Sequence, residues 1–442
     1  MTREGEGPGA EKPDDDGSSI ISSARLTVTS RSSDVQSEND EDEASRAKSL
    51  VILDACNRRD IDDLKDLALS EGGFLSDTIR CQAWPVLLGL DTPNGVGEYN
   101  NQTSTLGGAS TEPEHFESNF KNTNSGKGSW RELPRHRDEH QVCLDVERSF
   151  IYYPDHQSQA QLELKKTELS DLIVETLRRN PYLCYFQGYH DICQVFLLVL
   201  PVSLRAHAIA RLSALRIRDF MLPNLAPAIA QLCLIPCILN AVDPSLYRHL
   251  SQTEPFFALS GTLTMYAHDI QSYGDIARLF DALLAREQVF SVYMFAQIVL
   301  NRREELFYTP ANEPEMLHSI LSKLPHPLRL QELIEETGNL FERHPPESLY
   351  AWPRVSKASV MKTARDVKTC AAQSMGDGER FFERQLRELQ WADTREKMVR
   401  TFWMYRKPAR GMALAIVVGV AAVYLRRSPG IWAYLAPWLR WT

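Results

Sequence analysis

The sequence predicts an all-α protein that carries a membrane anchor near its C-terminus. Apolar side chains recur at helical spacing from Val142 onward, and no alternating apolar and polar run is long enough for a strand. One stretch, Gly411–Leu425, contains fifteen residues without a charge and is flanked by basic residues. The helical runs share no common repeat length, so we do not expect a solenoid.

The composition argues against several classes of protein. The chain has 442 residues, and 49 basic against 58 acidic side chains give a net charge of −9, which disfavours a basic nucleic-acid binder. A hydrophobic fraction of 43% supplies a sizeable core but is too low for a protein with many membrane spans. The eight cysteines form no C-x-x-C pair, so we expect reduced thiols rather than a zinc site or disulfides.

The N-terminal residues 1–46 are acidic and rich in serine. Acidic runs occur at Asp14–Asp16 and Glu38–Glu43, and large apolar side chains are few. Such a segment buries too little surface to offset the entropy lost on ordering. We therefore predict a disordered arm, either a solvated leader or a phosphorylatable regulatory tail. No basic start followed by an apolar run is present, so a secretory signal is not expected.

Helical patterning starts near Ala47, stops at Gly72-Gly73 and resumes over Thr78–Leu88. Residues 93–140 are then rich in Asn, Thr, Gly and Ser, which predicts a disordered loop. A loop of this length is unusual inside a compact domain. It therefore either separates two domains or is an insertion within one.

Successive helices follow. Gln159–Arg179 has an apolar stripe and ends at Asn180-Pro181, whereas Tyr189–Leu200 is apolar nearly all round, as a central buried helix is. Further helical runs, many bounded by Pro, Gly or Asn, span Ala206–Met221, Pro227–Val242, Pro244–Leu250, Phe256–His268, Tyr273–Arg286, Val289–Leu300, Pro314–Leu324 and Leu328–Phe341.

The C-terminal part changes character twice. Prolines and small residues from Pro345 to about Gly378 predict a linker, and Glu379–Arg400 is a charged helix. The uncharged stretch Gly411–Leu425 rises about 22 Å as a helix, which is short of the ~30 Å hydrocarbon core of a bilayer. Starting the span at Pro408 and letting the flanking arginines snorkel recovers part of this difference. We predict an anchor over 408–426 and an aromatic interfacial tail over 427–442. A buried core helix and a re-entrant hairpin are the alternatives, and a short span favours a thin early-secretory membrane.

Two short segments carry the candidate chemistry. Asp145 and Arg148 lie three residues apart, so on a helix they share a face and the carboxylate can fix the direction of the guanidinium. Gln187 and Gly188 lie in a short connector before the apolar helix, crowded by aromatic residues. A surface ion pair and a core hydrogen-bond network are the structural alternatives.

Other chemistries lack their motifs. His190-Asp191 suggests a hydrolase, but there is no G-x-S-x-G elbow and no nucleophile to pair with it. There is also no phosphate-binding G-x-x-x-x-G-K-[ST] loop and no H-E-x-x-H metal motif. An arginine and a glutamine remain, and supplied in trans they can speed GTP hydrolysis by neutralising phosphate charge and orienting water.

The sequence resembles the TBC-domain Rab GTPase-activating proteins in three motifs. R-x-x-x-W occurs as Arg80-Cys-Gln-Ala-Trp84, and I-x-x-D-x-x-R as Val142-Cys-Leu-Asp145-Val-Glu-Arg148 with Val for Ile. Y-x-Q-G occurs as Tyr185-Phe-Gln187-Gly188. Two weaker matches are LSGTLT at 259–264, where Gly261 stands in place of the usual Trp, and RLFD at 278–281.

The resemblance implies an all-α TBC domain over residues 47–345, with 93–140 as an insertion. It implies that Arg148 and Gln187 are the two catalytic residues, while Mg²⁺ and GTP belong to the Rab partner and the chain needs no cofactor of its own. The supporting residues it implies are Asp145, Tyr185, Gly188, Asp191, Arg80 and Trp84, the last two as structural or rim residues.

The resemblance extends to the membrane-anchored branch of this family. That branch implies a Rab-one-type substrate, a location at the endoplasmic reticulum or early Golgi, and a single-pass anchor with the bulk of the chain in the cytosol. Residues 346–407 then form the linker and charged helix. Two alternatives stay open: a membrane-tethered scaffold that binds Rab-GTP without accelerating hydrolysis, and a membrane-shaping protein that acts through its C-terminus.

Overall fold

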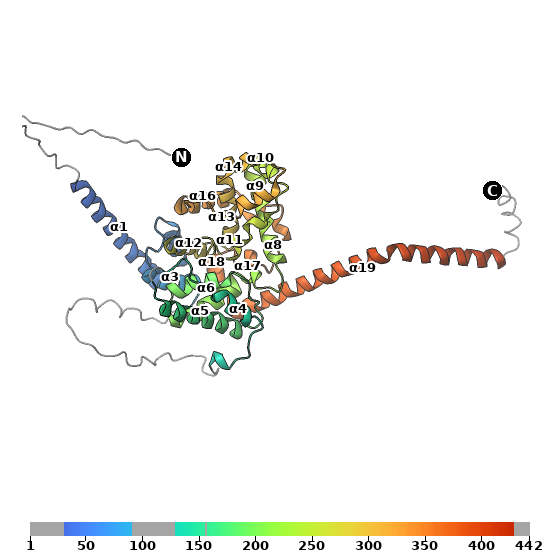
Figure 1. The fold of residues 1–442 in the computed structure, drawn as a ribbon, viewed down its shortest axis with the longest axis horizontal. Helices are drawn as coiled ribbons and strands as arrows, with labels where there is room; N and C mark the ends of the chain where they lie inside the picture. The colour runs from blue at the N-terminus through green and yellow to red at the C-terminus, as the bar shows by residue number, and fades with distance from the viewer. Residues whose placement is uncertain (1–30, 91–128, 155–156, 428–442) are drawn as a thin grey trace, which may run out of the picture. The chain divides into compact units, whose positions relative to one another are not determined.

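The computed structural model describes residues 31–90, 129–154 and 157–427 (Figure 1). Within these ranges every regular element is a helix, which confirms the predicted all-α class. The α-helices are α1 (Arg31–Arg58), α2 (Ile61–Leu69), α3 (Asp77–Leu87), α4 (Glu139–Val146), α5 (Gln159–Arg179), α6 (Tyr189–Val199), α7 (Val202–Leu215), α8 (Ala226–Leu232), α9 (Leu234–Val242), α10 (Pro244–His249), α11 (Leu259–Leu263), α12 (Tyr273–Ala285), α13 (Phe290–Asn301), α14 (Arg303–Tyr308), α15 (Pro314–Leu321), α16 (Leu330–Arg343), α17 (Val360–Thr363), α18 (Val367–Ala372) and α19 (Met375–Arg427). Short 3-10 helices are η1 (Trp130–Glu132), η2 (Arg218–Phe220), η3 (Pro255–Ala258), η4 (Pro346–Ser348) and η5 (Trp352–Arg354).

The chain divides into two units, Met1–Lys48 and Ser49–Thr442, and α1 runs through their boundary. In the first unit the helix begins at Arg31, where the sequence predicted a disordered arm up to residue 46. The acidic run Glu38–Glu43 therefore lies in a helix, for which glutamate has a good intrinsic propensity. The prediction of disorder for residues 1–30 lies outside the described residues.

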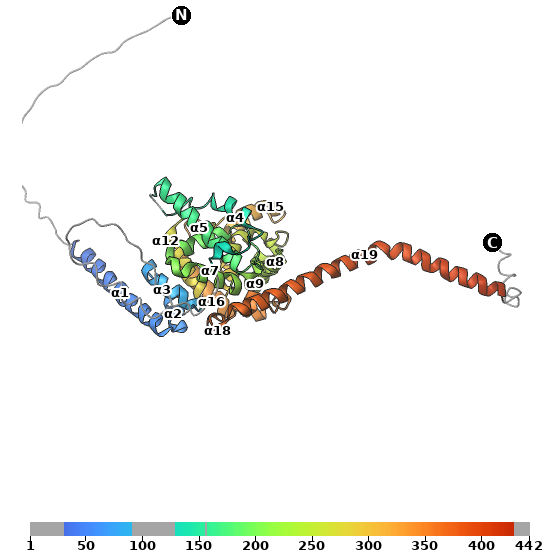
Figure 2. The same cartoon turned by 90° about the horizontal axis from the view of Figure 1, so that it is seen from below.

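Helix α6 is the central buried helix of the second unit, as its sequence predicted. Nine of its eleven residues are buried, and helices α5 and α7, both labelled in Figure 2, pack against it. Three aromatic rings connect helices α3, α6 and α12. Trp84 of α3, Phe196 of α6 and Phe280 of α12 lie with ring centroids 5.2–5.9 Å apart. These contacts join α6 to α3 and α12.

The chain resumes in helical form well before the predicted end of the 93–140 insertion. Residues 91–128 lie outside the described residues, but η1 and the start of α4 fall within the predicted loop. Arg178 of α5 donates to both carboxylate oxygens of Glu139 at 2.6 and 2.9 Å, and its guanidinium lies 5.6 Å from the Trp130 ring centroid. These contacts attach the segment to α5.

The predicted helix Phe256–His268 ends early, at Leu263. Met265 and Tyr266 adopt left-handed backbone conformations, with φ of 51° and 65°. The buried Tyr266 compensates for this strain, because its ring stacks on Phe295 and its hydroxyl donates to the carbonyl of Ser291 at 2.7 Å. The early end turns residues 264–268 into a loop rather than a helical turn.

The segment 346–378 was predicted to be a linker, whereas the structure folds it into four short helices within the second unit. Two buried charges hold it there. Arg218 donates to the carbonyl of Ala358 at 2.5 Å, and Asp219 accepts from the backbone N–H of Val360 at 3.1 Å. Gln385 at the start of α19 bonds both, at 2.9 Å to Arg218 and 2.7 Å to Asp219. Buried charges need such partners, and the segment supplies them.

Helix α19 contains both the predicted charged helix and the predicted anchor, 408–426. Its early residue Phe382 is buried, whereas its large apolar side chains from Trp391 to Tyr424 are exposed. Among the described residues, no single helix is long and apolar enough to cross a membrane. Met375–Arg406 and Arg410–Tyr424, bent by 49°, satisfy length and composition only as a pair. Residues 428–442, most of the predicted aromatic tail, lie outside the described ranges.

Candidate functional site

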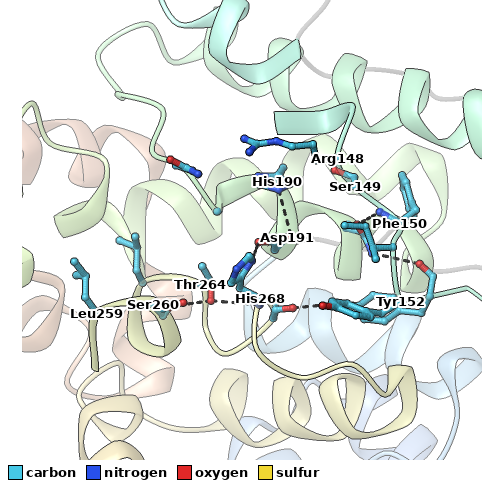
Figure 3. A pocket seen from close by; sticks show the side chains of 17 residues that line it. Arg148, Ser149, Phe150, Tyr152, His190, Asp191, Leu259, Ser260, Thr264 and His268 are labelled. Carbon is cyan, nitrogen blue, oxygen red and sulfur yellow. Dashed lines mark hydrogen bonds and ion pairs between the residues drawn. The ribbon is translucent and has the colours of Figure 1, made fainter. Parts of the chain in front are cut away.

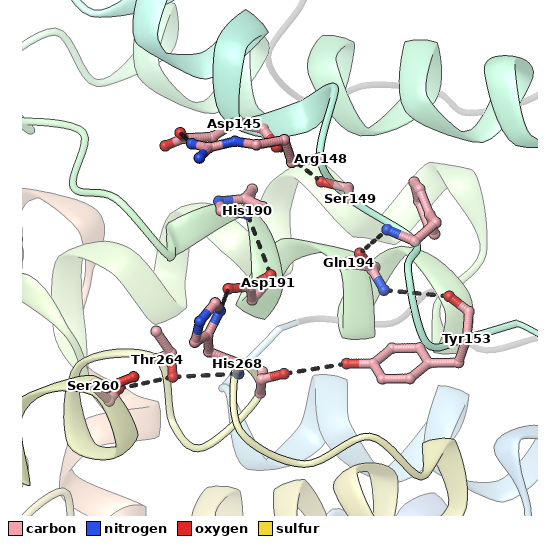
Figure 4. A network of polar contacts seen from close by, with 12 residues as sticks. Asp145, Arg148, Ser149, Tyr153, His190, Asp191, Gln194, Ser260, Thr264 and His268 are labelled. Carbon is pink, nitrogen blue, oxygen red and sulfur yellow. Dashed lines mark hydrogen bonds and ion pairs between the residues drawn. The ribbon is translucent and has the colours of Figure 1, made fainter. Parts of the chain in front are cut away.

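Arg148 follows the end of α4, and the carboxylate of Asp145 fixes its direction (Figure 4). Its Nη2 donates to Oδ1 of Asp145 at 2.6 Å, and Gln141 Nε2 donates to the same oxygen at 3.0 Å. The Asp145 side chain is fully buried, while 62% of the Arg148 side chain is exposed. The pair therefore orients a guanidinium without covering it, as the spacing of the two residues predicted.

The segment after Arg148 is held by α6. Phe150 has a φ of 61°, and its backbone N–H donates to Oε1 of Gln194 at 3.0 Å. The amide of Gln194 also donates to the carbonyl of Tyr153 at 3.4 Å. A buried amide from the central helix thus pins the backbone on the C-terminal side of the arginine.

Gln187 lies in the connector between α5 and α6, and its side chain is exposed. The next residue, Gly188, has a φ of 99°, and a Cβ there would come within 2.6 Å of Thr264 Cγ2. Only glycine fits this position without displacing the neighbouring loop. The connector is also fixed by Tyr185, whose backbone N–H donates to Asp138 Oδ2 at 2.9 Å.

Asp145 connects the two loops. The hydroxyl of Tyr185 donates to Oδ2 of Asp145 at 2.9 Å, while Oδ1 of the same carboxylate receives Arg148. The segments that carry Arg148 and Gln187 are therefore bonded to one buried carboxylate. Burial beside this carboxylate raises the pKa of Tyr185 far above its usual range, so the phenol stays protonated and can donate.

Arg148 and Gln187 line one open cavity of about 510 Å³ (Figure 3). Two of the predicted supporting residues, Gly188 and Asp191, line it as well. The opposite wall comes from α11 and the loop that follows it. The structure thus brings the two predicted catalytic residues together at an accessible surface. The residues of that opposite wall are Leu259, Ser260, Leu263, Thr264, Ala267 and His268.

Asp191 lies between two imidazoles. His190 Nε2 lies 3.3 Å from its Oδ1, and His268 Nδ1 lies 3.0 Å from its Oδ2. His190 also contacts the Tyr185 hydroxyl through Nδ1 at 3.2 Å. A continuous polar chain therefore runs from Arg148 through Asp145, Tyr185, His190 and Asp191 to the far wall of the cavity.

The two imidazoles differ in burial and in charge preference. Burial lowers the pKa of His190, which favours its neutral form near pH 7. The hydrogen bond to Asp191 raises the pKa of His268 above its ordinary value of 6.5, which favours its cationic form. The carboxylate of Asp191 therefore faces one neutral and one readily protonated ring.

Arg80 and Trp84 lie outside this cavity. Both are buried and bond to Asp281 of α12, Arg80 through Nε at 3.1 Å and Trp84 through Nε1 at 2.8 Å. Asp281 also accepts the backbone N–H of Phe74 at 3.0 Å. These contacts connect α3 to α12, so the geometry assigns the two residues to the core.

The weaker motif with Gly261 also lies in the core. A Cβ at this position would approach the rings of Phe295 and Tyr266 to 3.3 Å. The aromatic rings of Tyr266 and Phe295 therefore occupy the space beside the glycine, and local packing is maintained without a tryptophan.

Sequence reasoning missed three residues of the site. Gln194 lies in the middle of an apolar helix and is buried. Because buried polar groups need hydrogen-bond partners, an amide at this position could have indicated a structural role. Thr264 and His268 lie in the segment predicted to be helical, more than seventy residues from Gly188 and Asp191, and local pattern gives no signal for such pairings.

The cavity offers positive charge and hydrogen-bond donors. In the described parts of the chain, no three His, Cys, Asp or Glu side chains are grouped to hold a metal ion. All eight cysteines are free. The exposed guanidinium of Arg148 and the amide of Gln187 in the cavity lining suit an anionic group brought by another molecule.

A scan against protein-family models matches residues 77–307 to RabGAP-TBC, the Rab-GTPase-TBC domain. The chain belongs to this family. The RabGAP-TBC match includes Arg148 and Gln187 and all the residues that line the cavity. The match ends at residue 307, before the segment 346–378 that Arg218 and Asp219 bind. The folded body therefore extends beyond the family domain.

Curated relatives match this RabGAP-TBC chain along most of its length. TBC1 domain family member 20 of Bos taurus is 32% identical over 85% of this chain and 87% of its own length. GTPase-activating protein gyp10 of Schizosaccharomyces pombe is 31% identical over 75% of this chain and 82% of its own. The solved Ypt/Rab-GAP domain of Gyp1p covers 64% of this chain and 92% of its own at 17% identity, with a TM-score of 0.46.

Proposed function

We propose that this protein accelerates GTP hydrolysis by a Rab GTPase, to which it supplies Arg148 and Gln187 in trans. The observation that carries the proposal is the shared cavity, in which an exposed, oriented guanidinium and an exposed amide lie at one surface. Membership of the RabGAP-TBC family supplies the partner class.

Each residue has a distinct role in this mechanism. The guanidinium of Arg148 neutralises negative charge that develops on the β- and γ-phosphates during bond cleavage. The amide of Gln187 orients the attacking water. Asp145 acts as a positioning residue because it fixes Arg148 directly and the Gln187 connector through Tyr185. GTP and Mg²⁺ arrive with the Rab, so the chain needs no cofactor of its own.

We further propose a Rab-one-type substrate and a location at the endoplasmic reticulum or early Golgi, with a single-pass anchor at 408–426 and the body in the cytosol. The similarity to TBC1 domain family member 20 along most of both chains supports this choice. The uncharged stretch 411–425 supports the anchor.

A non-catalytic scaffold for Rab-GTP is the competing function. A scaffold needs a binding surface but has no use for an oriented, exposed guanidinium beside an exposed amide. A pull-down with GTP-loaded Rab, combined with hydrolysis measured on the same complex, separates binding from turnover. Binding without turnover would favour the scaffold.

A panel of purified Rab GTPases tests the catalytic proposal. We expect the full chain in detergent to stimulate hydrolysis by at least one Rab, and Gln187→Ala to lower that turnover by about 10²–10³-fold, the cost of one lost transition-state donor. Gln159→Ala is the matched control, because Gln159 is also exposed but lies at the start of α5 outside the cavity. Full activity in Gln187→Ala contradicts the mechanism.

Charges placed in the uncharged stretch test the anchor. We expect Val417→Arg with Val418→Arg to move the protein from the membrane to the soluble fraction, because each central arginine costs about 2.5–3.5 kcal/mol of insertion free energy. Stimulated hydrolysis in solution should be retained. Val417→Leu with Val418→Leu keeps the segment apolar and should remain in the membrane fraction. A charged variant that still sediments with membranes argues against the anchor.

A further inference from the structure

His268 is an exposed histidine in the wall of the cavity opposite Arg148 (Figure 3). Its side chain is 63% exposed, almost the same as the 62% of Arg148. Unlike a core histidine, it therefore faces the space that a docked molecule would fill.

The position of this ring is set by two elements. Its Nδ1 lies 3.0 Å from Asp191 Oδ2, and its backbone N–H donates to the hydroxyl of Thr264 at 3.4 Å. Asp191 lies in the first turn of α6, where the helix N-terminus stabilises a carboxylate. Among the described residues, the other ring nitrogen, Nε2, makes no hydrogen bond. One edge of the imidazole is thus fixed and the other remains available to a ligand.

We propose that His268, in its protonated form, is a second cation of the cavity that donates a hydrogen bond to an anionic oxygen of the docked Rab–GTP complex. This inference rests on the proposed function and assigns to the same site a residue that determines how activity depends on pH. The anionic oxygen belongs either to a nucleotide phosphate or to a carboxylate on the Rab surface.

The charged groups around His268 favour its protonation. Asp191 faces it from α6 and Asp269 lies beside it in the same loop, while His190 is the neutral ring across Asp191. Asp191 is the main anionic partner because its hydrogen bond raises the pKa of His268 most, while Asp269, whose own pKa is raised by burial, contributes less. Because the pKa of His268 lies above 6.5, the ring is cationic below that raised pKa and becomes neutral as the pH rises through it. Stimulated hydrolysis should therefore increase as the pH falls.

The experiment measures kcat and KM for the full chain in detergent, with a Rab that it stimulates, between about pH 6 and about pH 8. We expect kcat/KM of the wild type to fall by about tenfold as the pH rises, the contribution of one charge-assisted hydrogen bond. His268→Gln keeps a donor without the charge and should be flat at the lower value. His268→Lys restores a permanent cation and should be flat at the higher value.

The controls separate His268 from other titrating groups. His207→Gln on α7 removes an exposed histidine outside the cavity and should keep the slope of the wild type. The intrinsic hydrolysis of the Rab alone is subtracted at each pH. A change in kcat assigns the contact to the nucleotide phosphate, whereas a change in KM alone assigns it to a surface carboxylate.

A flat profile for active wild-type protein overturns the inference and leaves the proposed function intact. The same holds if His268→Gln retains the slope. Absence of any stimulated hydrolysis by the wild type overturns both.

Discussion

Replacement of Arg148 by alanine should reduce the stimulated GTP hydrolysis of the Rab partner by about 10³–10⁵-fold, the contribution expected of an arginine supplied in trans. The physical reason is that its guanidinium cancels charge that exists only in the transition state, so the loss falls on kcat more than on Rab binding. Single-turnover hydrolysis at saturating protein measures this directly.

The matched control for this loss is Arg131→Ala. Arg131 has the same side-chain exposure, 62%, and pairs with an exposed aspartate, Asp171, at 2.5 Å, but it lies outside the cavity. It should retain full activity. Arg148→Ala should remain folded, with a Tm within about 4 °C of the wild type, because Gln141 and Tyr185 still donate to Asp145. An Arg148→Ala protein with wild-type turnover is incompatible with the mechanism.

Replacement of Asp219 by alanine should cost about 3–5 kcal/mol of the free energy of unfolding, because it leaves the buried Arg218 without a nearby anion. The substitution also removes the hydrogen-bond acceptor of the Gln231 and Gln385 amides, which donate to this carboxylate at 2.7 Å each. Such a loss is a large fraction of the ~5–15 kcal/mol that stabilises a typical domain. Urea unfolding followed by tryptophan fluorescence checks the value.

Limited proteolysis localises the effect. Asp219→Ala should expose residues 346–374 to cleavage, since Asp219 accepts from Val360 within that segment. Asp171→Ala removes an exposed aspartate of α5 and should change the stability by less than about 0.5 kcal/mol. If Asp219→Ala resists urea and protease as well as the wild type, residues 346–389 are not anchored as described.

Local pattern was sufficient for several of the helices, α5 and α6 among them, and for singling out Arg148 and Gln187 as candidates. Helix α5 has the predicted bounds and α6 differs by one residue, because amphipathic spacing and the neighbouring Asn-Pro and Leu-Pro boundaries are local signals. The Asp145–Arg148 pair follows from helical spacing alone, and its orientation in the structure matches that prediction. The catalytic roles themselves stay predictions until the variants are assayed.

Local sequence pattern could not predict which residues pair over long distances along the chain. Arg80 and Trp84 meet Asp281 about two hundred residues away, and His268 meets Asp191 across seventy-seven. The linker prediction failed for a related reason: prolines and small residues near 346–378 indicate irregular backbone, but not whether that backbone is packed. The buried Arg218-Asp219 pair required partners, and these came from a distant segment that no local pattern identifies.

The attachment of α19 to the body has a mechanical consequence. Gln385 ties the start of this helix to Arg218 and Asp219, and Leu389 still packs against the core. Residues 390–407 then continue as helix toward the uncharged stretch, a rise of about 27 Å. If 408–426 lie in a bilayer, as we propose, this helical stretch would separate the folded body from the lipid surface. A Rab partner would then meet the folded body away from the membrane surface.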